Sequence, residues 1–78
     1  MEVICISDNL ETAIGLRFSG INTIVINNRE EINNYLETII KENKIGIVVV
    51  TKKIYELCKE KIEQICNNSK LPLIVNIP

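Results

Sequence analysis

Four short runs of apolar, largely β-branched residues recur along the chain, and the stretches between them have apolar residues at helical spacing. The longest run, 45–51 (IGIVVVT), has no polar residue before its closing threonine. A continuous run this short is typical of a strand that is covered on both faces, as parallel sheets require. Runs at 3–6, 23–26 and 71–75 predict three further strands. We therefore expect four strands, with 45–51 at the centre of the sheet.

The stretch after the first run predicts a helix over about 9–18. Asp8 followed by Glu11 has the spacing of a capping box, and Gly20 supplies a glycine terminus. Gly15 lies inside this helix, where we expect it to permit close packing on the sheet. The residues that recur at helical spacing are Leu10, Ala13, Ile14, Arg17 and Phe18.

The other two polar stretches predict one helix each. Asn28 followed by Glu31 repeats the capping signature, and the second helix is expected to end near Asn43. Thr51 is expected to cap the third helix, which continues as far as 67–69 (NNS). Apolar stripes support both helices: Ile32, Leu36, Ile39 and Ile40 in the second, and Ile54, Leu57, Cys58, Ile62 and Ile65 in the third.

This order of elements predicts an α/β fold with a single parallel sheet. Strands that alternate with helices over short connections form right-handed crossovers. The strongest apolar runs are those of the first and third strands, which therefore belong in the middle of the sheet. The expected strand order is 2-1-3-4, with helices on both faces, as in Rossmann and flavodoxin-like folds. Residues 1–78 are expected to form one domain.

The predicted winding leaves part of the sheet without a helix. The first helix lies on one face, and the second and third helices lie on the other. One helix cannot cover four strands, so we expect an apolar half-face to be exposed over the third and fourth strands, and such patches usually mark a partner surface. A partner or a segment beyond Pro78 would cover it. The alternative is that the first helix shifts over this half-face.

Composition narrows the possible functions. Hydrophobic residues make up 46% and charged residues 24%, as in a folded globular domain, and the net charge is -1. This balance offers no broad basic surface for nucleic acid. No apolar run approaches the roughly 20 residues that span a bilayer, and we expect no signal peptide before the first strand. The chain has no histidine, and its three cysteines lack a C-x-x-C pair. We therefore expect no metal, no cofactor and a cytoplasmic location with reduced thiols.

Two side chains near the end of the first strand are candidates for phosphoryl chemistry. Cys5 has the position of the phosphocysteine in sugar-transport IIB domains, but Ser7 and Asp8 follow it instead of a loop of small residues. Asp8 has the position of an acidic residue in receiver domains, which place an aspartate where this chain has Thr51. We favour a buried thiol and a helix cap, with a phosphotransfer domain using Cys5 or Asp8 as the alternative.

Lys52 and Lys53 are the least expected charges in the sequence. Two cations in the first turn of a helix oppose its dipole and cost a few tenths of a kcal/mol each. Their place at the outlet of the central strand suits an acidic partner, although an exposed pair tolerated by the fold is an equal alternative. Cys58 and Cys66 are expected to be partly buried small apolar residues.

Three segments of the chain resemble the F subunit of A-type and V-type rotary ATPases, in the same order and spacing. The run 45–51 resembles that family's central strand with its threonine, and 71–78 (LPLIVNIP) resembles its closing Leu-Pro strand. The family's Gly-aromatic-Arg-Leu-Ala-Gly segment is matched by Ser7, Asp8, Thr12 and the stretch 14–21 (IGLRFSGI). Leu16 and Phe18 exchange the aromatic and aliphatic positions of that segment, which conserves volume.

The resemblance implies a non-catalytic subunit of the central stalk. Such a subunit sits on the coiled-coil D subunit, contacts other rotary-ATPase subunits, and is peripheral to the membrane on the cytoplasmic side. It turns with the shaft and helps couple ATP hydrolysis or synthesis to proton or sodium transport. Family members continue past the closing proline into a C-terminal helix that engages the shaft, and we expect that tail to be absent here.

The partner-binding residues are expected on the outlet side of the sheet and on the first helix. They are Asp8, Asn9, Arg17, Thr51, Lys52 and Lys53. No catalytic, cofactor-binding or metal-binding residue is expected. A nucleotide-binding module is a third and weaker hypothesis, because the chain has neither a P-loop nor a dinucleotide fingerprint.

Overall fold

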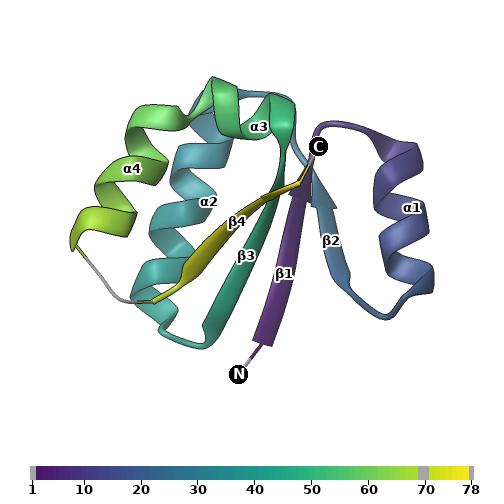
Figure 1. Ribbon diagram of the computed structural model, residues 1–78, viewed down its shortest axis with the longest axis horizontal. Helices are drawn as coiled ribbons and strands as arrows, with labels where there is room; N and C mark the ends of the chain where they lie inside the picture. Colours follow the sequence, from purple (N-terminus) through teal and green to yellow (C-terminus); the bar gives the residue numbers. More distant parts are fainter. Residues whose placement is uncertain (1, 69–70, 78) are drawn as a thin grey trace.

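The computed structural model describes residues 2–68 and 71–77 and contains one four-stranded parallel sheet (Figure 1). The strands lie in the order β2-β1-β3-β4, so the predicted fold class and strand order are confirmed. The elements along the chain are β1 (Glu2–Ser7), α1 (Leu10–Phe18), β2 (Asn22–Val25), α2 (Arg29–Glu42), β3 (Ile45–Thr51), α3 (Lys52–Leu57), α4 (Lys59–Asn68) and β4 (Leu73–Ile77).

The main core lies between the sheet and helices α2, α3 and α4. Even-numbered residues of the two central strands point into it, and they include Ile6, Val48 and Val50, each fully buried. Leu36 of α2 and Ile62 of α4 close the same cluster from the helix side. Figure 1 shows α2 and α4 on one side of the sheet and α1 alone on the other. Odd-numbered strand residues therefore face the side that carries one helix.

The second helix is capped as the sequence predicts. The side chain of Asn28 accepts a hydrogen bond from the Glu31 N–H at 3.1 Å. Asn43 ends the helix in the left-handed conformation, with φ at 57°. Because a short polar side chain tolerates this conformation, asparagine serves here where glycine is more usual.

The cap expected at Asp8 was wrong by one residue. Asn9 caps α1, and its side chain accepts a hydrogen bond from the Thr12 N–H at 3.1 Å. Asp8 instead accepts a hydrogen bond from the Thr51 hydroxyl at 2.7 Å. Thr51 therefore makes no side-chain cap for α3, although it is the residue that precedes that helix. A contact between two strand ends, distant in sequence, replaced both predicted local caps.

The third predicted helix is two helices. It breaks at Cys58, between α3 and α4, and the break leaves the Leu57 carbonyl free to accept a hydrogen bond from Arg29 Nε at 3.0 Å. The last strand was also misplaced at its start, because β4 begins at Leu73, after Pro72, and continues to Ile77. Proline has no N–H to donate to a ladder, which is consistent with its place just outside the strand.

The apolar stripe expected on the first helix was mostly wrong. Ala13 alone is fully buried in α1, whereas Leu10, Ile14 and Phe18 are 59%, 43% and 88% exposed. A Cβ atom at Gly15 would meet no atom within 4 Å, so Gly15 does not serve close packing on the sheet. Helix α1 therefore attaches to the sheet through a narrow contact, and its apolar residues largely face away.

Candidate functional site

An apolar strip lies on the α1 side of the sheet. It consists of side chains from β1, β3 and β4 that share one face: Val3, Ile47, Val49, Leu73 and Val75. Val3, Ile47 and Leu73 are aligned across the three strands, and Val49 lies beside Val75. Leu73 is 56% exposed, Val75 38% and Val3 37%, while the other two are half-buried. We call these five residues the bare strip.

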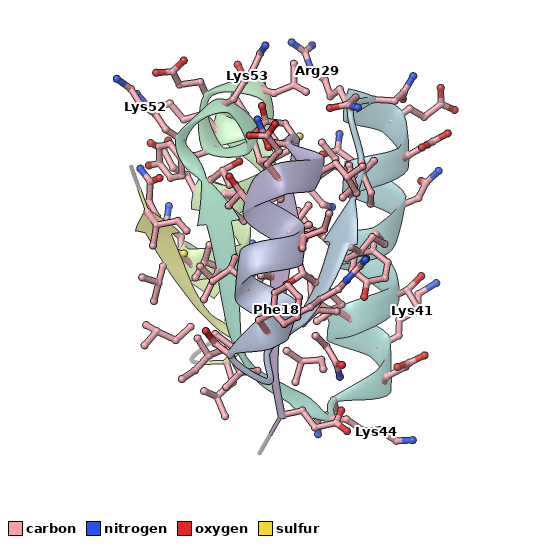
Figure 2. All side chains as sticks on the ribbon, turned by 90° about the vertical axis from the view of Figure 1, so that its right-hand side faces the viewer. Phe18, Arg29, Lys41, Lys44, Lys52 and Lys53 are labelled. Atoms are coloured by element: carbon pink, nitrogen blue, oxygen red, sulfur yellow. The ribbon has the colours of Figure 1, made fainter. Side chains whose placement is uncertain are left out.

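Helix α1 does not shift over the bare strip. It packs against β1 and β2, where it buries Cys5, Ser7 and Thr23 on the same face of the sheet. In Figure 2 α1 lies in front of the sheet, and β3 and β4 are visible to its left without a helix over them. The half-face predicted over the third and fourth strands is therefore exposed in the structure. Apolar side chains gathered on one exposed face favour a docking surface.

Four of the sequence-predicted partner residues gather at the carboxyl end of β1 and β3. Thr51 is buried and donates its hydroxyl hydrogen to half-buried Asp8, which fixes the two strand ends together. Lys52 and Lys53 follow directly and are exposed (Figure 2). These two cations are free to meet an acidic group beyond the end of the strip, whereas Thr51 is occupied within the fold.

Asn9 and Arg17 also have structural contacts. Asn9 caps α1, and its backbone N–H donates to the hydroxyl of Ser7 at 3.0 Å. The guanidinium of Arg17 donates to the carbonyl of Thr23 through Nε at 3.2 Å and Nη2 at 2.8 Å. Arg17 thus lies at the last turn of α1 and the start of β2, away from the other predicted residues.

The thiol of Cys5 is not placed for phosphoryl chemistry. Its side chain is completely buried, and burial raises the pKa of the thiol above its ordinary value. A thiol with a raised pKa holds little thiolate at neutral pH, and the thiolate is the nucleophile. Cys58 is buried as well, as expected, but Cys66 is exposed, so its predicted partial burial was wrong.

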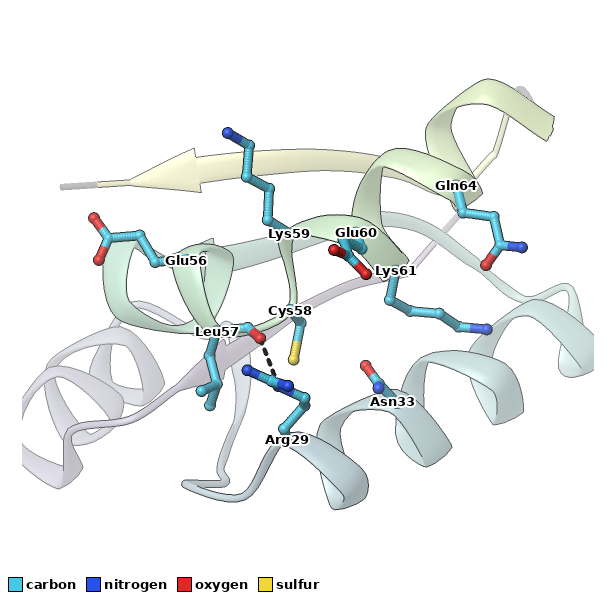
Figure 3. Close-up of a pocket in the computed structure, with 9 residues that line it drawn as sticks. All are labelled: Arg29, Asn33, Glu56, Leu57, Cys58, Lys59, Glu60, Lys61 and Gln64. Atoms are coloured by element: carbon cyan, nitrogen blue, oxygen red, sulfur yellow. Dashed lines mark hydrogen bonds between the residues drawn. The ribbon is translucent and has the colours of Figure 1, made fainter.

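A polar cleft of about 700 Å³ lies between α2 and the break between α3 and α4 (Figure 3). Three cations and two carboxylates surround it, so its charge is mixed. Arg29 lies across the cleft, bound to the Leu57 carbonyl, with the sulfur of Cys58 pointing toward it (Figure 3). The residues that line the cleft are Arg29, Asn33, Glu56, Leu57, Cys58, Lys59, Glu60, Lys61 and Gln64.

The chemistry of this cleft does not suggest an active site. Burial raises the pKa of Cys58, and the opposing effect of nearby Arg29 is smaller. The side-chain oxygen of Asn33 is buried without a hydrogen-bond partner among the residues that the structure describes. Lys61, on the cleft wall, forms an ion pair with Glu37 that joins α4 to α2. Among the described residues that line the cleft, none is an activated nucleophile beside a base.

Within residues 2–68 and 71–77, no cluster of histidine, cysteine or acidic side chains could hold a metal ion. In the same ranges, every helix is too short or too polar to cross a bilayer.

Sequence reasoning located the bare half-face but missed the residues that form it. In runs such as 45–51 every position is apolar, so the alternation that distinguishes the two faces of a strand is not visible. Which face of each strand is covered becomes clear only when the helices are placed on the sheet. The register that aligns the odd positions of adjacent strands is known only from the structure, so the sequence carried no signal for these residues.

Comparisons with known proteins agree on one kind of protein. A model of the family described as the ATP synthase (F/14-kDa) subunit matches residues 3–78. The F subunit of the A-type ATP synthase of Methanothermobacter thermautotrophicus is 29% identical over 76 residues, which are 96% of this chain and 71% of that protein. The crystal structure of the F subunit of the V-type ATP synthase from Archaeoglobus fulgidus superposes with a TM-score of 0.70 at 19% identity, over 99% of this chain and 96% of that chain.

Proposed function

The chain belongs to the family of the ATP synthase (F/14-kDa) subunit, and we propose that it is a non-catalytic central-stalk subunit of an A-type or V-type rotary ATPase. In this role it binds the coiled-coil D subunit on the cytoplasmic side of the membrane, turns with the shaft, and helps couple ATP hydrolysis or synthesis to proton or sodium transport. The observation that carries the proposal is the bare strip, an exposed apolar surface beside α1.

The width of the bare strip suits a helix. Neighbouring strands are about 4.8 Å apart, so the part of the bare strip over β3 and β4 is about 10 Å wide, which matches the diameter of one α-helix with its side chains. A helix placed there would lie beside α1 and complete the layer that α1 leaves unfinished. A coiled coil presents long helices with both apolar and charged positions along their surfaces, so it has the shape and the chemistry that this surface needs.

Charge supports the same partner. Lys52 and Lys53 are exposed at the carboxyl end of β3, and α3 has no acidic residue in its first turn to neutralise them. An acidic segment of the partner, placed at this end of the strip, would relieve the unfavourable interaction of the two cations with the dipole of α3. The six predicted partner residues thus remain a proposal, in which Lys52 and Lys53 contribute charge and the bare strip contributes most of the contact area.

Formation of a complex with the D subunit tests the proposed function. We expect the purified chain and the D subunit, when mixed, to elute together on gel filtration in a stoichiometric complex. Incubation of the chain alone with a phosphodonor should leave its intact mass unchanged. Separate elution of the two proteins, or a stable phosphoryl adduct on this chain, would contradict the proposal.

A further inference from the structure

Gly15, in the middle of α1, is not explained by the fold. A glycine inside a helix destabilises it relative to alanine, because glycine loses more backbone freedom on folding. Gly15 has an ordinary helical backbone, whereas the left-handed backbone of Gly20, with φ at 84°, favours glycine. A Cβ atom at Gly15 would meet no atom within 4 Å. The part of the chain that the structure describes therefore gives no reason for a glycine at this position.

The neighbours of Gly15 on α1 show which way this position faces. Ala13 is buried where α1 packs on β1 and β2. Arg17, one turn further along, reaches β2 through its hydrogen bond to the Thr23 carbonyl. Each residue turns a helix by about 100°, so Gly15 lies about 160° from both Ala13 and Arg17. Gly15 therefore faces away from the sheet.

One flank of α1 lies toward the bare strip. Arg17 is on the β2 side of Ala13. Thr12 and Leu16 are on the other side of Ala13, about 100° and 60° around the helix, and so they lie on the flank toward β3. Both of these side chains are half-buried. Gly15 comes about 60° after Thr12 in the outward direction, at the border between this flank and the outer face of α1.

A coiled coil brings two helices, and the bare strip has room for one of them. Helices in contact have axes about 8–10 Å apart. If the first helix lies over β3 and β4 beside α1, the second can contact both of them only in the groove above the pair. The three axes then form a triangle, in which the direction from α1 to the second helix is about 60° outward of the direction to the first. With Thr12 on the flank toward the first helix, Gly15 faces the second.

We propose that the second helix of the D-subunit coiled coil crosses α1 at Gly15. This inference rests on the proposed function and adds a second contact to it, because the bare strip holds one helix and α1 holds the other. The missing side chain allows two backbones to approach closely. A helix suits such an approach better than an extended chain, because its backbone groups are already hydrogen-bonded within the helix. Phe18, 88% exposed and one turn after Gly15, supplies apolar surface beside the crossing (Figure 2).

Isothermal titration calorimetry of Gly15→Ala with the D subunit tests this crossing. We expect the free variant to unfold at a higher urea concentration than the wild type, because alanine favours the helix and its methyl group has room. Its affinity for the D subunit should fall roughly tenfold, because the methyl group overpacks the contact between the two helices. Weaker binding by a more stable variant is not the result of misfolding.

Asn34→Ala is the matched control. Asn34 is exposed on α2, across the sheet from α1, and alanine favours a helix over asparagine as well as over glycine. We expect this variant to be stabilised and to keep the affinity of the wild type. If the wild type binds and Gly15→Ala binds equally well, the crossing is overturned and the proposed function stands. A wild type that does not bind the D subunit would overturn both.

The ring of Phe18 provides a second measurement on the unmodified chain. Phe18 is the only phenylalanine in the sequence, so selective labelling of phenylalanine gives NMR signals from this ring alone. We expect these signals to shift or broaden as the D subunit is added. Unchanged signals from Phe18 in a formed complex would overturn the crossing, and would leave the bare strip as the contact surface.

Discussion

Leu73→Asp is expected to weaken binding to the D subunit strongly while the fold stays intact. The side chain of Leu73 is 56% exposed at one end of the bare strip, so a carboxylate there is solvated in the free chain. Under a docked helix the same carboxylate would be buried without a partner, which costs about 3 kcal/mol. That cost corresponds to a loss of affinity of roughly a hundredfold. Isothermal titration calorimetry with the D subunit measures it.

Asn76→Asp is the matched control for this variant. It introduces the same charge on the same strand, but Asn76 is exposed on the opposite face, next to Lys52 and Lys59. We expect its affinity for the D subunit to fall by no more than a few-fold, because the new carboxylate only weakens the attraction of neighbouring Lys52 for an acidic partner. Equal affinities for Leu73→Asp and the wild type would show that the bare strip is not the contact surface.

Leu36→Ala is expected to bring the chain close to unfolding. Leu36 is 1% exposed in α2 and packs in the core between that helix and the sheet. Truncating a fully buried leucine costs about 3 kcal/mol, because apolar contacts are lost and a cavity remains. Small domains have little stability to lose, often about 5 kcal/mol in total. The free energy of unfolding from urea titration should fall by more than half.

The matched control for Leu36→Ala is Leu36→Met, which nearly conserves the volume of the side chain. Substitutions of this kind usually cost less than about 1.5 kcal/mol. A loss below about 1 kcal/mol for Leu36→Ala would contradict the packing described for this residue, because so small a cost is typical of a site that water already reaches.

The sequence was sufficient to predict the sheet because each strand has the apolar run of a buried parallel strand. Residues 45–51 are apolar on both faces of the central strand, and α2 has a polar outer face with a capping asparagine before it. These signals come from neighbouring residues in the sequence, and the central strand and α2 pack in the structure as the signals predict. The strand order could be predicted because the two most apolar strands, the first and the third, need a neighbouring strand on each side.

The caps at the ends of β1 and β3 could not be predicted in the same way. Asp8 and Asn9 are adjacent, and each has a side chain able to cap α1. The contact that decides between them, from the Thr51 hydroxyl to Asp8, joins residues that are 43 positions apart. A local pattern has no information about such a contact. The same contact explains why Thr51 does not cap α3.

The expected partner residues stay a prediction. Polarity and position at the sheet outlet suggested Asp8, Asn9 and Arg17, and each of them also has a hydrogen-bond partner within the fold. Exposed apolar residues were not considered individually, because an apolar residue in a strand is normally assigned to the core. Leu73 and Val75 are exposed because α1 packs on β1 and β2, and no described helix lies over this face of β3 and β4.

Methyl NMR of the chain during titration with the D subunit tests the docking surface most directly. Val49 and Val75 lie in the bare strip, whereas Val48 and Val50 are fully buried on the other face of β3. We expect the methyl signals of Val49 and Val75 to shift or broaden as the D subunit is added, while those of Val48 and Val50 change little. Unchanged strip methyls in a formed complex, with the shifts located elsewhere on the chain, would contradict a docking role for the bare strip.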